Sequence, residues 1–246
     1  MAGGIKVQIL DDEQAVAGLA AKFIVELLRR RPDAVLGLAT GSTPEPTYDE
    51  LVRLHCEEGL SFSKVRTLNL DEYLGLDGDH EQSFRFFMQK HLFGHLDIRP
   101  WNTFIFDGMA REPEQECLAF EAKIRGLGGV DLWLLGLGGN GHIAFNEPGS
   151  TAGSRSRVVT PDPETVEANS RHFADPREVP RRGLTVGVGT ILDGRSIVLL
   201  ATGAHKAEAV ARAVEGPRSV DCPASLLQDH PDCFFLLDRP AAARLS

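Results

Sequence analysis

The sequence has little of what marks secreted, membrane-spanning or disulfide-stapled proteins. Only four of its 246 residues are cysteine, and no two of them form a C-x-x-C pair, which argues against a disulfide framework or a zinc motif. No apolar run approaches the roughly 20 residues of a membrane-spanning helix, and the N-terminal segment has no apolar core of a signal peptide. We therefore expect a cytoplasmic protein without a membrane partner, whose cysteines are reduced, buried thiols.

Positive charge is also in short supply. The 26 lysines and arginines are outnumbered by 35 acidic residues, for a formal net charge of −9, so a general nucleic-acid-binding surface is not expected. Any anionic ligand must then be held by a local site. Hydrophobic residues make up 42% of the chain and charged residues 25%, which is typical of a globular protein. We find no repeat or linker, and we expect residues 1–246 to form one domain.

Short apolar runs alternate with segments of helical spacing along most of the chain. This alternation predicts an α/β fold with a mostly parallel, doubly wound (Rossmann-like) sheet and helices on both faces. Asp11 and Asp12 are suited to cap the first helix, and Arg29, Arg30 and Arg31 at its end are interpreted as solvated charges. The aromatic residues of the third helix are interpreted as core. Strands are expected at 6–10, 34–39, 65–70, 103–106, 132–135, 196–201 and 234–237, and helices at 12–31, 48–56, 83–92, 112–125 and 223–227, with a further helix after Lys206 that runs through Val210 and Val214 and a glycine-interrupted segment at 184–191.

A glycine-rich stretch after the predicted strand at 132–135 is the centre of the chain. It reads G-L-G-G-N-G-H-I-A-F-N-E-P-G-S from Gly136 and places Asn140, His142 and Glu147 beside the strand's end. In open α/β sheets, ligands bind at the carboxyl ends of strands, so these side chains and Gly138 are candidate site residues. The alternative is a glycine-rich turn with a structural histidine, because the spacing matches neither a dinucleotide-binding nor a P-loop motif.

A second candidate element follows the apolar run at 34–39. The turn Thr40, Gly41, Ser42 and Thr43 leads through Pro44 into a helix, so backbone amides and hydroxyls converge on the positive end of the helix dipole. This arrangement suits a phosphate group. The alternative is an ordinary helix start with proline in its first turn.

Two acidic residues end the strand predicted at 65–70. The segment T-L-N-L-D-E-Y places Asp71 and Glu72 where the ligand crevice is expected, so one of them is a candidate general base. The alternative is that they cap the following turn.

The segment from 160 to 180 is the least core-like part of the chain. It carries four prolines and Arg171, and long irregular insertions of this kind often act as lids over a site. Lys206, at the junction between a predicted strand and helix, is a further candidate phosphate contact. The alternative for the 160–180 segment is a solvated loop with an incidental arginine.

Taken together, these motifs resemble the glucosamine-6-phosphate deaminase (isomerase) family in order and spacing over 36–217. The resemblance rests on L-A-T-G-S-T-P, L-N-L-D-E-Y, G-G-N-G-H-I-A-F-N-E-P-G-S, A-N-S-R, L-T-V-G-V-G-T-I-L-D and G-A-H-K-A. It implies that D-glucosamine 6-phosphate and water are converted to D-fructose 6-phosphate and ammonia, with neither cofactor nor metal. The substrate partner would be a hexosamine 6-phosphate, and the chain could associate as a homo-oligomer.

The resemblance also implies a role for each candidate residue. Asp71 would be the base that moves a proton between carbons 2 and 1, and His142, partnered by Glu147, would assist ring opening. Phosphate and substrate contacts would come from Thr40, Gly41, Ser42, Thr43, Glu72, Gly138, Arg171 and Lys206, under a lid at about 160–180.

Two departures from the family pattern affect these expectations. Many members have an acidic residue where this chain has Asn140, and asparagine can orient an imidazole but cannot stabilise its cation by charge. Members activated by N-acetylglucosamine 6-phosphate have a lysine where this chain has Val159, and a longer C-terminal tail. With only Arg157 retained, we expect hyperbolic kinetics that do not respond to that effector.

Two other functions are weighed against this one. The 6-phosphogluconolactonases resemble the family in fold, but ester hydrolysis needs no carbon base such as Asp71. Sugar-phosphate sensor domains of transcription repressors bind without turnover, but they carry a helix-turn-helix region for which a first strand at Lys6 leaves no room.

Overall fold

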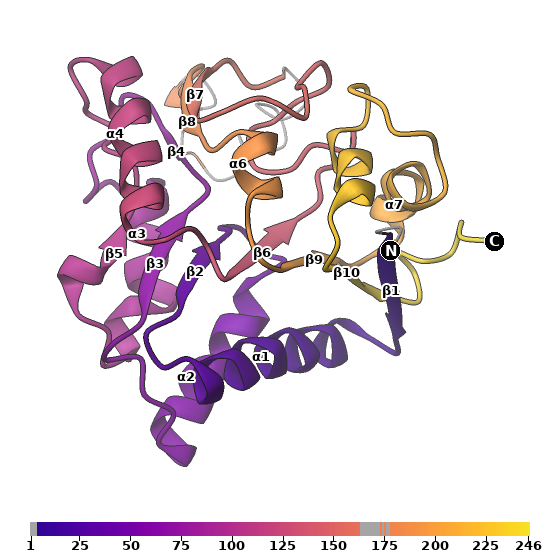
Figure 1. Ribbon diagram of the computed structural model, residues 1–246, viewed down its shortest axis with the longest axis horizontal. Coiled ribbons are helices and arrows are strands. Elements are labelled where there is room, and N and C mark those ends of the chain that lie inside the picture. Colours follow the sequence, from indigo (N-terminus) through magenta and orange to yellow (C-terminus); the bar gives the residue numbers. More distant parts are fainter. Residues whose placement is uncertain (1–3, 163–172, 174, 176–177) are drawn as a thin grey trace.

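The computed structural model describes residues 4–162, 173, 175 and 178–246, and its centre is a seven-stranded sheet (Figure 1). The strands follow the order β1-β10-β9-β6-β2-β3-β5, and every neighbouring pair is parallel. The central strands are apolar on both faces, as expected for a sheet covered on both sides. The strands are β1 (Ile5–Leu10), β2 (Val35–Leu38), β3 (Arg66–Asn69), β5 (Thr103–Phe104), β6 (Leu132–Gly136), β9 (Ile197–Ala201) and β10 (Cys233–Asp238).

Helices cover both faces of this sheet, which confirms the predicted fold class. On one face Ile24, Leu51 and Met88 share a core cluster with alternate residues of the strands; on the other face Phe120, Ile191 and Val210 do the same. The first face carries α1 (Glu13–Arg30), α2 (Glu45–Glu58) and α3 (Phe84–His91), and the second carries α4 (Pro113–Gly126), α6 (Val188–Leu192) and α7 (Ala207–Val214). Short 3-10 turns lie at Phe93–His95, Pro100–Asn102, Ala204–Lys206 and Pro223–Asp229.

The first helix shows how local sequence sets its ends and where one expectation was wrong. The Asp12 carboxylate accepts a hydrogen bond from the backbone N–H of Ala15 at 2.8 Å, which is the predicted cap. At the other end, Arg31 is not simply solvated. Its guanidinium donates to Asp131 at 2.6 Å, and the Asp131 side chain is only 3% exposed. A buried carboxylate needs such a partner, so Arg31 ties the helix end to the start of β6.

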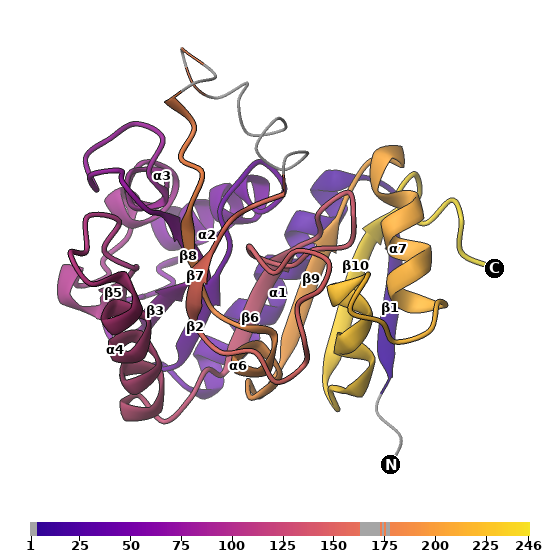
Figure 2. The ribbon, with the colours of Figure 1, turned by 90° about the horizontal axis from the view of Figure 1, so that it is seen from above.

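A second, smaller sheet was not predicted. It has three antiparallel strands in the order β4-β8-β7: β4 (Asp71–Tyr73), β7 (Arg157–Val159) and β8 (Gly183–Thr185). Figures 1 and 2 place β7 and β8 on the side of the main sheet that also carries α4 and α6. The glycine-interrupted segment at 184–191 therefore divides between β8 and α6. The strand predicted at 103–106 is shortened to two residues in β5.

The chain reverses its direction across the sheet between β2 and β6. From β2 it continues outward through β3 to β5, and from β6 it continues the other way through β9 to β10. Such a switch point opens a crevice at the carboxyl ends of the two strands. Gly37 of β2 leaves room for the fully buried ring of its β6 partner Trp133, because a Cβ on Gly37 would overlap that ring.

Two compositional expectations can be compared with the structure. Three of the four thiols are buried and unpaired, but Cys56 is exposed, so the expectation that all are buried was wrong. Within the described residues, no helix is both long enough and apolar enough to cross a bilayer.

Candidate active site

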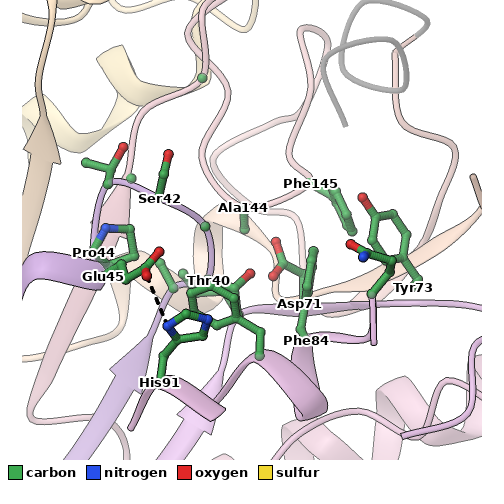
Figure 3. Close-up of a pocket in the computed structure, with 18 of the residues that line it drawn as sticks. Thr40, Ser42, Pro44, Glu45, Asp71, Tyr73, Phe84, His91, Ala144 and Phe145 are labelled. Carbon is green, nitrogen blue, oxygen red and sulfur yellow. Dashed lines mark ion pairs between the residues drawn. The ribbon is translucent and has the colours of Figure 1, made fainter. Parts of the chain in front are cut away.

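A cavity of about 660 Å³ opens at the switch point, beside the carboxyl ends of β2 and β6 (Figure 3). It brings together segments that are distant in sequence: the turn after β2, the start of β4, the glycine-rich loop after β6, helix α3 and the turn before α7. Its lining includes Thr40, Gly41, Ser42, Thr43, Asp71, Tyr73, Phe84, Phe87, Lys90, His91, Gly138, Asn140, His142, Ala144, Phe145, Phe173 and Lys206.

The turn after β2 forms one wall of the cavity. Residues Thr40, Gly41, Ser42 and Thr43 all line it, and Gly41 has a φ of +103°, which an L side chain rarely adopts. Helix α2 begins directly afterwards and has no side-chain cap at its first turn. Pro44 and Pro46 have no N–H and the Thr47 N–H donates to the Pro44 carbonyl at 3.0 Å, so the groups suited to an anion are the backbone amides and hydroxyls of the turn itself, beside the positive end of the helix.

Asp71 lies on the floor between this turn and the aromatic residues of the opposite wall (Figure 3). It is the first residue of β4 and pairs with Thr185 of β8, which fixes its backbone. Its side chain belongs to a residue only 7% exposed, and burial, with a smaller contribution from the negative charge of Glu72, raises its pKa to about 8. Asp71 is thus a carboxyl group poised to exchange a proton near neutral pH.

Glu72, also a predicted substrate contact, is not among the residues that line the cavity in the described part of the chain. Its carboxylate accepts hydrogen bonds from the backbone N–H groups of Tyr73, Phe84 and Arg85 at 2.8, 2.9 and 2.9 Å. Burial raises the pKa of Glu72, whereas these amides favour its ionised form. The carboxylate therefore anchors the start of α3 to β4, close to the capping role that the sequence left open.

The glycine-rich loop builds a three-residue network around His142. Its Nδ1 lies 2.8 Å from Asn140 Oδ1 and 3.3 Å from Glu147 Oε2, and the Asn140 amide donates to that same Glu147 oxygen at 2.8 Å. The backbone N–H of His142 also donates to Asn140 Oδ1, at 3.1 Å.

These contacts determine both the amide orientation and the imidazole tautomer. Turning the Asn140 amide over would set its NH₂ against the N–H of His142 and its oxygen against the Glu147 carboxylate, so only one orientation satisfies both neighbours. Because both groups that face Nδ1 are acceptors, Nδ1 carries the proton. The neutral imidazole therefore keeps Nε2 as its free base nitrogen, the arrangement a proton shuttle needs.

Gly138 has a steric role that the sequence did not indicate. The ring of His142 lies directly against its Cα, so that an added Cβ would overlap three ring atoms. The backbone N–H of Gly138 also donates to the carbonyl of His142 at 2.9 Å. The glycine thus leaves room for the imidazole and closes the turn that carries it.

Of the two remaining candidate phosphate contacts, the structure describes only Lys206. Lys206 lines the cavity from the turn before α7. Arg171 lies outside the described residues, as does most of the segment expected to form a lid. Phe173, from that same segment, is described; it is buried and lines the cavity.

Sequence reasoning missed the aromatic wall of the cavity. Tyr73, Phe84 and Phe145 pack together with ring centroids 4.9 to 5.8 Å apart (Figure 3). The aromatic residues of α3 were expected to be core, yet only Met88 of that helix is fully buried, and Phe84 and Phe87 line the cavity. Tyr73, Phe84 and Phe145 come from three separate parts of the chain, and no local sequence pattern indicates that their rings meet at one cavity.

A histidine–glutamate pair was missed for the same reason. His91 Nδ1, at the end of α3, lies 3.1 Å from the carboxylate of Glu45, the first residue of α2, and both line the cavity (Figure 3). In the described part of the chain, no group of three or more His, Cys, Asp or Glu side chains is arranged to hold a metal ion.

Comparison with known proteins adds an independent finding. A family profile described as glucosamine-6-phosphate isomerases/6-phosphogluconolactonase matches residues 11–235. The chain is 53% identical over 222 residues to glucosamine-6-phosphate deaminase 1 of Giardia intestinalis, covering 90% of this chain and 84% of that protein. It is 51% identical over 241 residues to the glucosamine-6-phosphate deaminase of Rhodopirellula baltica, covering 98% and 96%.

Among solved structures, the chain is more similar to a glucosamine-6-phosphate deaminase than to a 6-phosphogluconolactonase. A structure described as a monomeric glucosamine-6-phosphate deaminase superimposes with a TM-score of 0.96 at 45% identity, covering 98% of this chain and all of the other. A 6-phosphogluconolactonase from Trypanosoma cruzi superimposes with a TM-score of 0.78 at 24% identity, covering 100% and 98%. At this level of identity, the similarity to the lactonase shows a shared fold and no more.

Proposed function

Because this chain belongs to the family of glucosamine-6-phosphate isomerases and 6-phosphogluconolactonases, we propose that it is a glucosamine-6-phosphate deaminase. The reaction converts D-glucosamine 6-phosphate and water to D-fructose 6-phosphate and ammonia. The observation that carries the proposal is the placement of Asp71 and His142 on one cavity whose opposite end is an anion cradle. Asp71 can then transfer a proton between carbon atoms, His142 can assist ring opening, and the turn can bind the phosphate.

The phosphate binds at the turn of Thr40 to Thr43 and against Lys206. The backbone amides and hydroxyls of the turn, the positive end of the α2 dipole and the lysine's point charge all favour an anion there. A phosphate held at this end places the sugar ring toward Asp71, because the cavity extends in that direction (Figure 3).

His142 assists opening of the pyranose ring. Its free Nε2 accepts the proton of the anomeric hydroxyl and returns a proton to the ring oxygen, which yields the open-chain aldehyde. The carboxylate of Glu147, 3.3 Å from Nδ1, stabilises the imidazolium formed in between. The Asn140 amide fixes the positions of His142 and Glu147 relative to each other through a hydrogen bond to each.

Asp71 then moves a proton from carbon 2 to carbon 1. Loss of the carbon 2 proton gives an enolic intermediate, and its return at carbon 1 leaves an iminium at carbon 2. Water adds to that carbon and ammonia leaves, which gives the ketone of fructose 6-phosphate. The substrate's ammonium group favours the ionised form of Asp71 on binding, since an opposite charge lowers a carboxyl pKa.

The test is to measure ammonia and fructose 6-phosphate released from glucosamine 6-phosphate, with hydrolysis of 6-phosphogluconolactone run in parallel. We expect equal amounts of the two products and a loss of about 10²- to 10⁴-fold in kcat for Asp71→Asn, which is the range that general base catalysis contributes. Asp79→Asn, at an exposed position, serves as the matched control. Lactone hydrolysis without ammonia release would replace the proposal with a lactonase, and tight binding without turnover would replace it with a sensor.

A further inference from the structure

A segment far from the cavity in sequence holds both ends of the loop that carries His142. Residues 219–224, which lead from the loop after α7 into the first two residues of the 3-10 turn Pro223–Asp229, are here called the bracket segment. The backbone N–H of Ala224 donates to the carbonyl of Gly141 at 2.9 Å, just before His142. The backbone N–H of Gly149, just after Glu147, donates to the carbonyl of Val220 at 2.8 Å.

The contact with the turn is close. Gly141 has a φ of +94°, and a Cβ on it would lie 2.6 Å from Sγ of Cys222, a residue only 3% exposed. Cys222 of the bracket segment therefore packs directly against the backbone of Gly141. A small displacement of either partner is transmitted to the other, because packed interiors deform little.

Arg212 joins the bracket segment to the turn. It stands in the last turn of α7, half-buried, and its guanidinium donates to two carbonyls: Nη1 to Asn140 at 3.3 Å and Nη2 to Asp221 at 2.6 Å. Hydrogen bonds from a charged donor are stronger than neutral ones, and the planar fork fixes the two carbonyls relative to each other.

The carbonyl that Arg212 holds belongs to the residue at the centre of the site network. Rotation of the Asn140 backbone would move its side-chain oxygen away from His142 and its side-chain amide away from Glu147 together. The cavity lining, as far as the described residues define it, does not include Arg212. We infer that Arg212 is a positioning residue, which acts on ring opening through Asn140 without touching the substrate.

This inference rests on the proposed deaminase activity, and a simpler role competes with it. A cation in the last turn of a helix complements the helix dipole, and that role alone would affect stability but not the chemical step. Loss of positioning instead predicts a lower kcat at an unchanged KM, since the groups that bind the phosphate lie elsewhere in the cavity.

The experiment compares Arg212→Met and Arg212→Lys with Arg218→Met. Arg218 is an exposed arginine six residues further on, which pairs with Asp229 and contacts neither end of the loop. For each variant we would measure kcat, KM, the pH dependence of kcat and the melting temperature.

We expect Arg212→Met to lower kcat about ten- to hundredfold at a KM within about twofold of wild type, because small misplacements of catalytic groups cost that much. Its acid limb of kcat should also move. Arg212→Lys should recover part of the loss, since an ammonium can serve one carbonyl. Arg218→Met should match wild type. A melting temperature lowered at wild-type kcat and pH profile would overturn the inference, as would wild-type values throughout.

A double-mutant cycle with Asn140→Ala sharpens the result. If Arg212 acts through the Asn140 side chain, Arg212→Met should cost much less in kcat when that side chain is absent, whereas independent effects would multiply. If Arg212→Met does not fold, the same cycle with Arg212→Lys tests whether Arg212 acts through the Asn140 side chain. If wild type releases no ammonia, the proposed function fails instead, so the two failures are distinguishable.

Discussion

Replacing Asp71 by asparagine should remove activity and at the same time stabilise the protein. Burial raises the Asp71 pKa from its ordinary 3.8 to about 8. Each pKa unit corresponds to about 1.4 kcal/mol, so ionising this group costs the folded state up to about 6 kcal/mol relative to the unfolded chain. Asparagine has nearly the same shape and no charge to bury.

The sign and the pH window follow from the raised pKa. Below about pH 4 the carboxyl is protonated in both states and contributes nothing. As the pH rises from there to about 8, the unfolded chain releases the proton while the folded protein keeps it, so the wild type loses stability by about 1.4 kcal/mol per pH unit through this group. Above pH 8 the penalty is constant.

The measurement is the free energy of unfolding in urea at pH 4.5, 6, 7 and 8.5 for wild type, Asp71→Asn and the exposed control Asp79→Asn. The advantage of Asp71→Asn over wild type should be about 1 kcal/mol at pH 4.5 and several kcal/mol at pH 8.5. Any fixed cost of packing the amide cancels from this slope. A difference between the two proteins that stays the same within about 0.5 kcal/mol across the range would refute the claim that Asp71 is strained by burial.

Three other predictions concern the site. Gly138→Ala should lower kcat at least about a hundredfold in a protein that still folds, because the added methyl displaces the ring of His142; wild-type kcat would contradict this placement. Asn140→Asp should move the acid limb of kcat, which reports the substrate complex in which Asp71 is already ionised, to higher pH, because a carboxylate beside the imidazole favours its cation; an unchanged limb would count against Asn140 acting by geometry alone. Rate curves should be hyperbolic with and without N-acetylglucosamine 6-phosphate, since Val159 offers no charge where activated relatives have a lysine; a sigmoidal curve relieved by that compound would refute this.

Much of the main sheet could be predicted because its signals are local. An apolar run followed by glycines or hydroxyls marks a strand end, and this pattern located β2, β6 and the loops that line the cavity. The same reasoning failed for β4, β7 and β8, which have three residues each. Strands that short carry no periodicity, and they form only because their partners are already in place.

Contacts between distant segments were also out of reach. Arg31 and Asp131 are 100 residues apart, and the sequence around Arg31 is that of any basic helix end. Glu72 could not be separated from Asp71 by position, since both stand at a strand's end. The structure separates them because successive residues of a strand point to opposite faces, which sends one carboxylate into the cavity and the other to the amides of α3.

That separation also explains why a destabilising carboxylate is tolerated. Were Asp71 hydrogen-bonded to amides like its neighbour, its pKa would fall and it would become a weaker base. Held instead in a buried cavity, it is largely protonated until a cationic substrate enters. The ammonium group then shifts the group toward its charged form next to the carbon that must lose a proton. The acid limb of kcat/KM, which reports the free enzyme, should therefore lie at higher pH than that of kcat, which reports the complex. Coincident limbs would mean that substrate binding leaves Asp71 as it was.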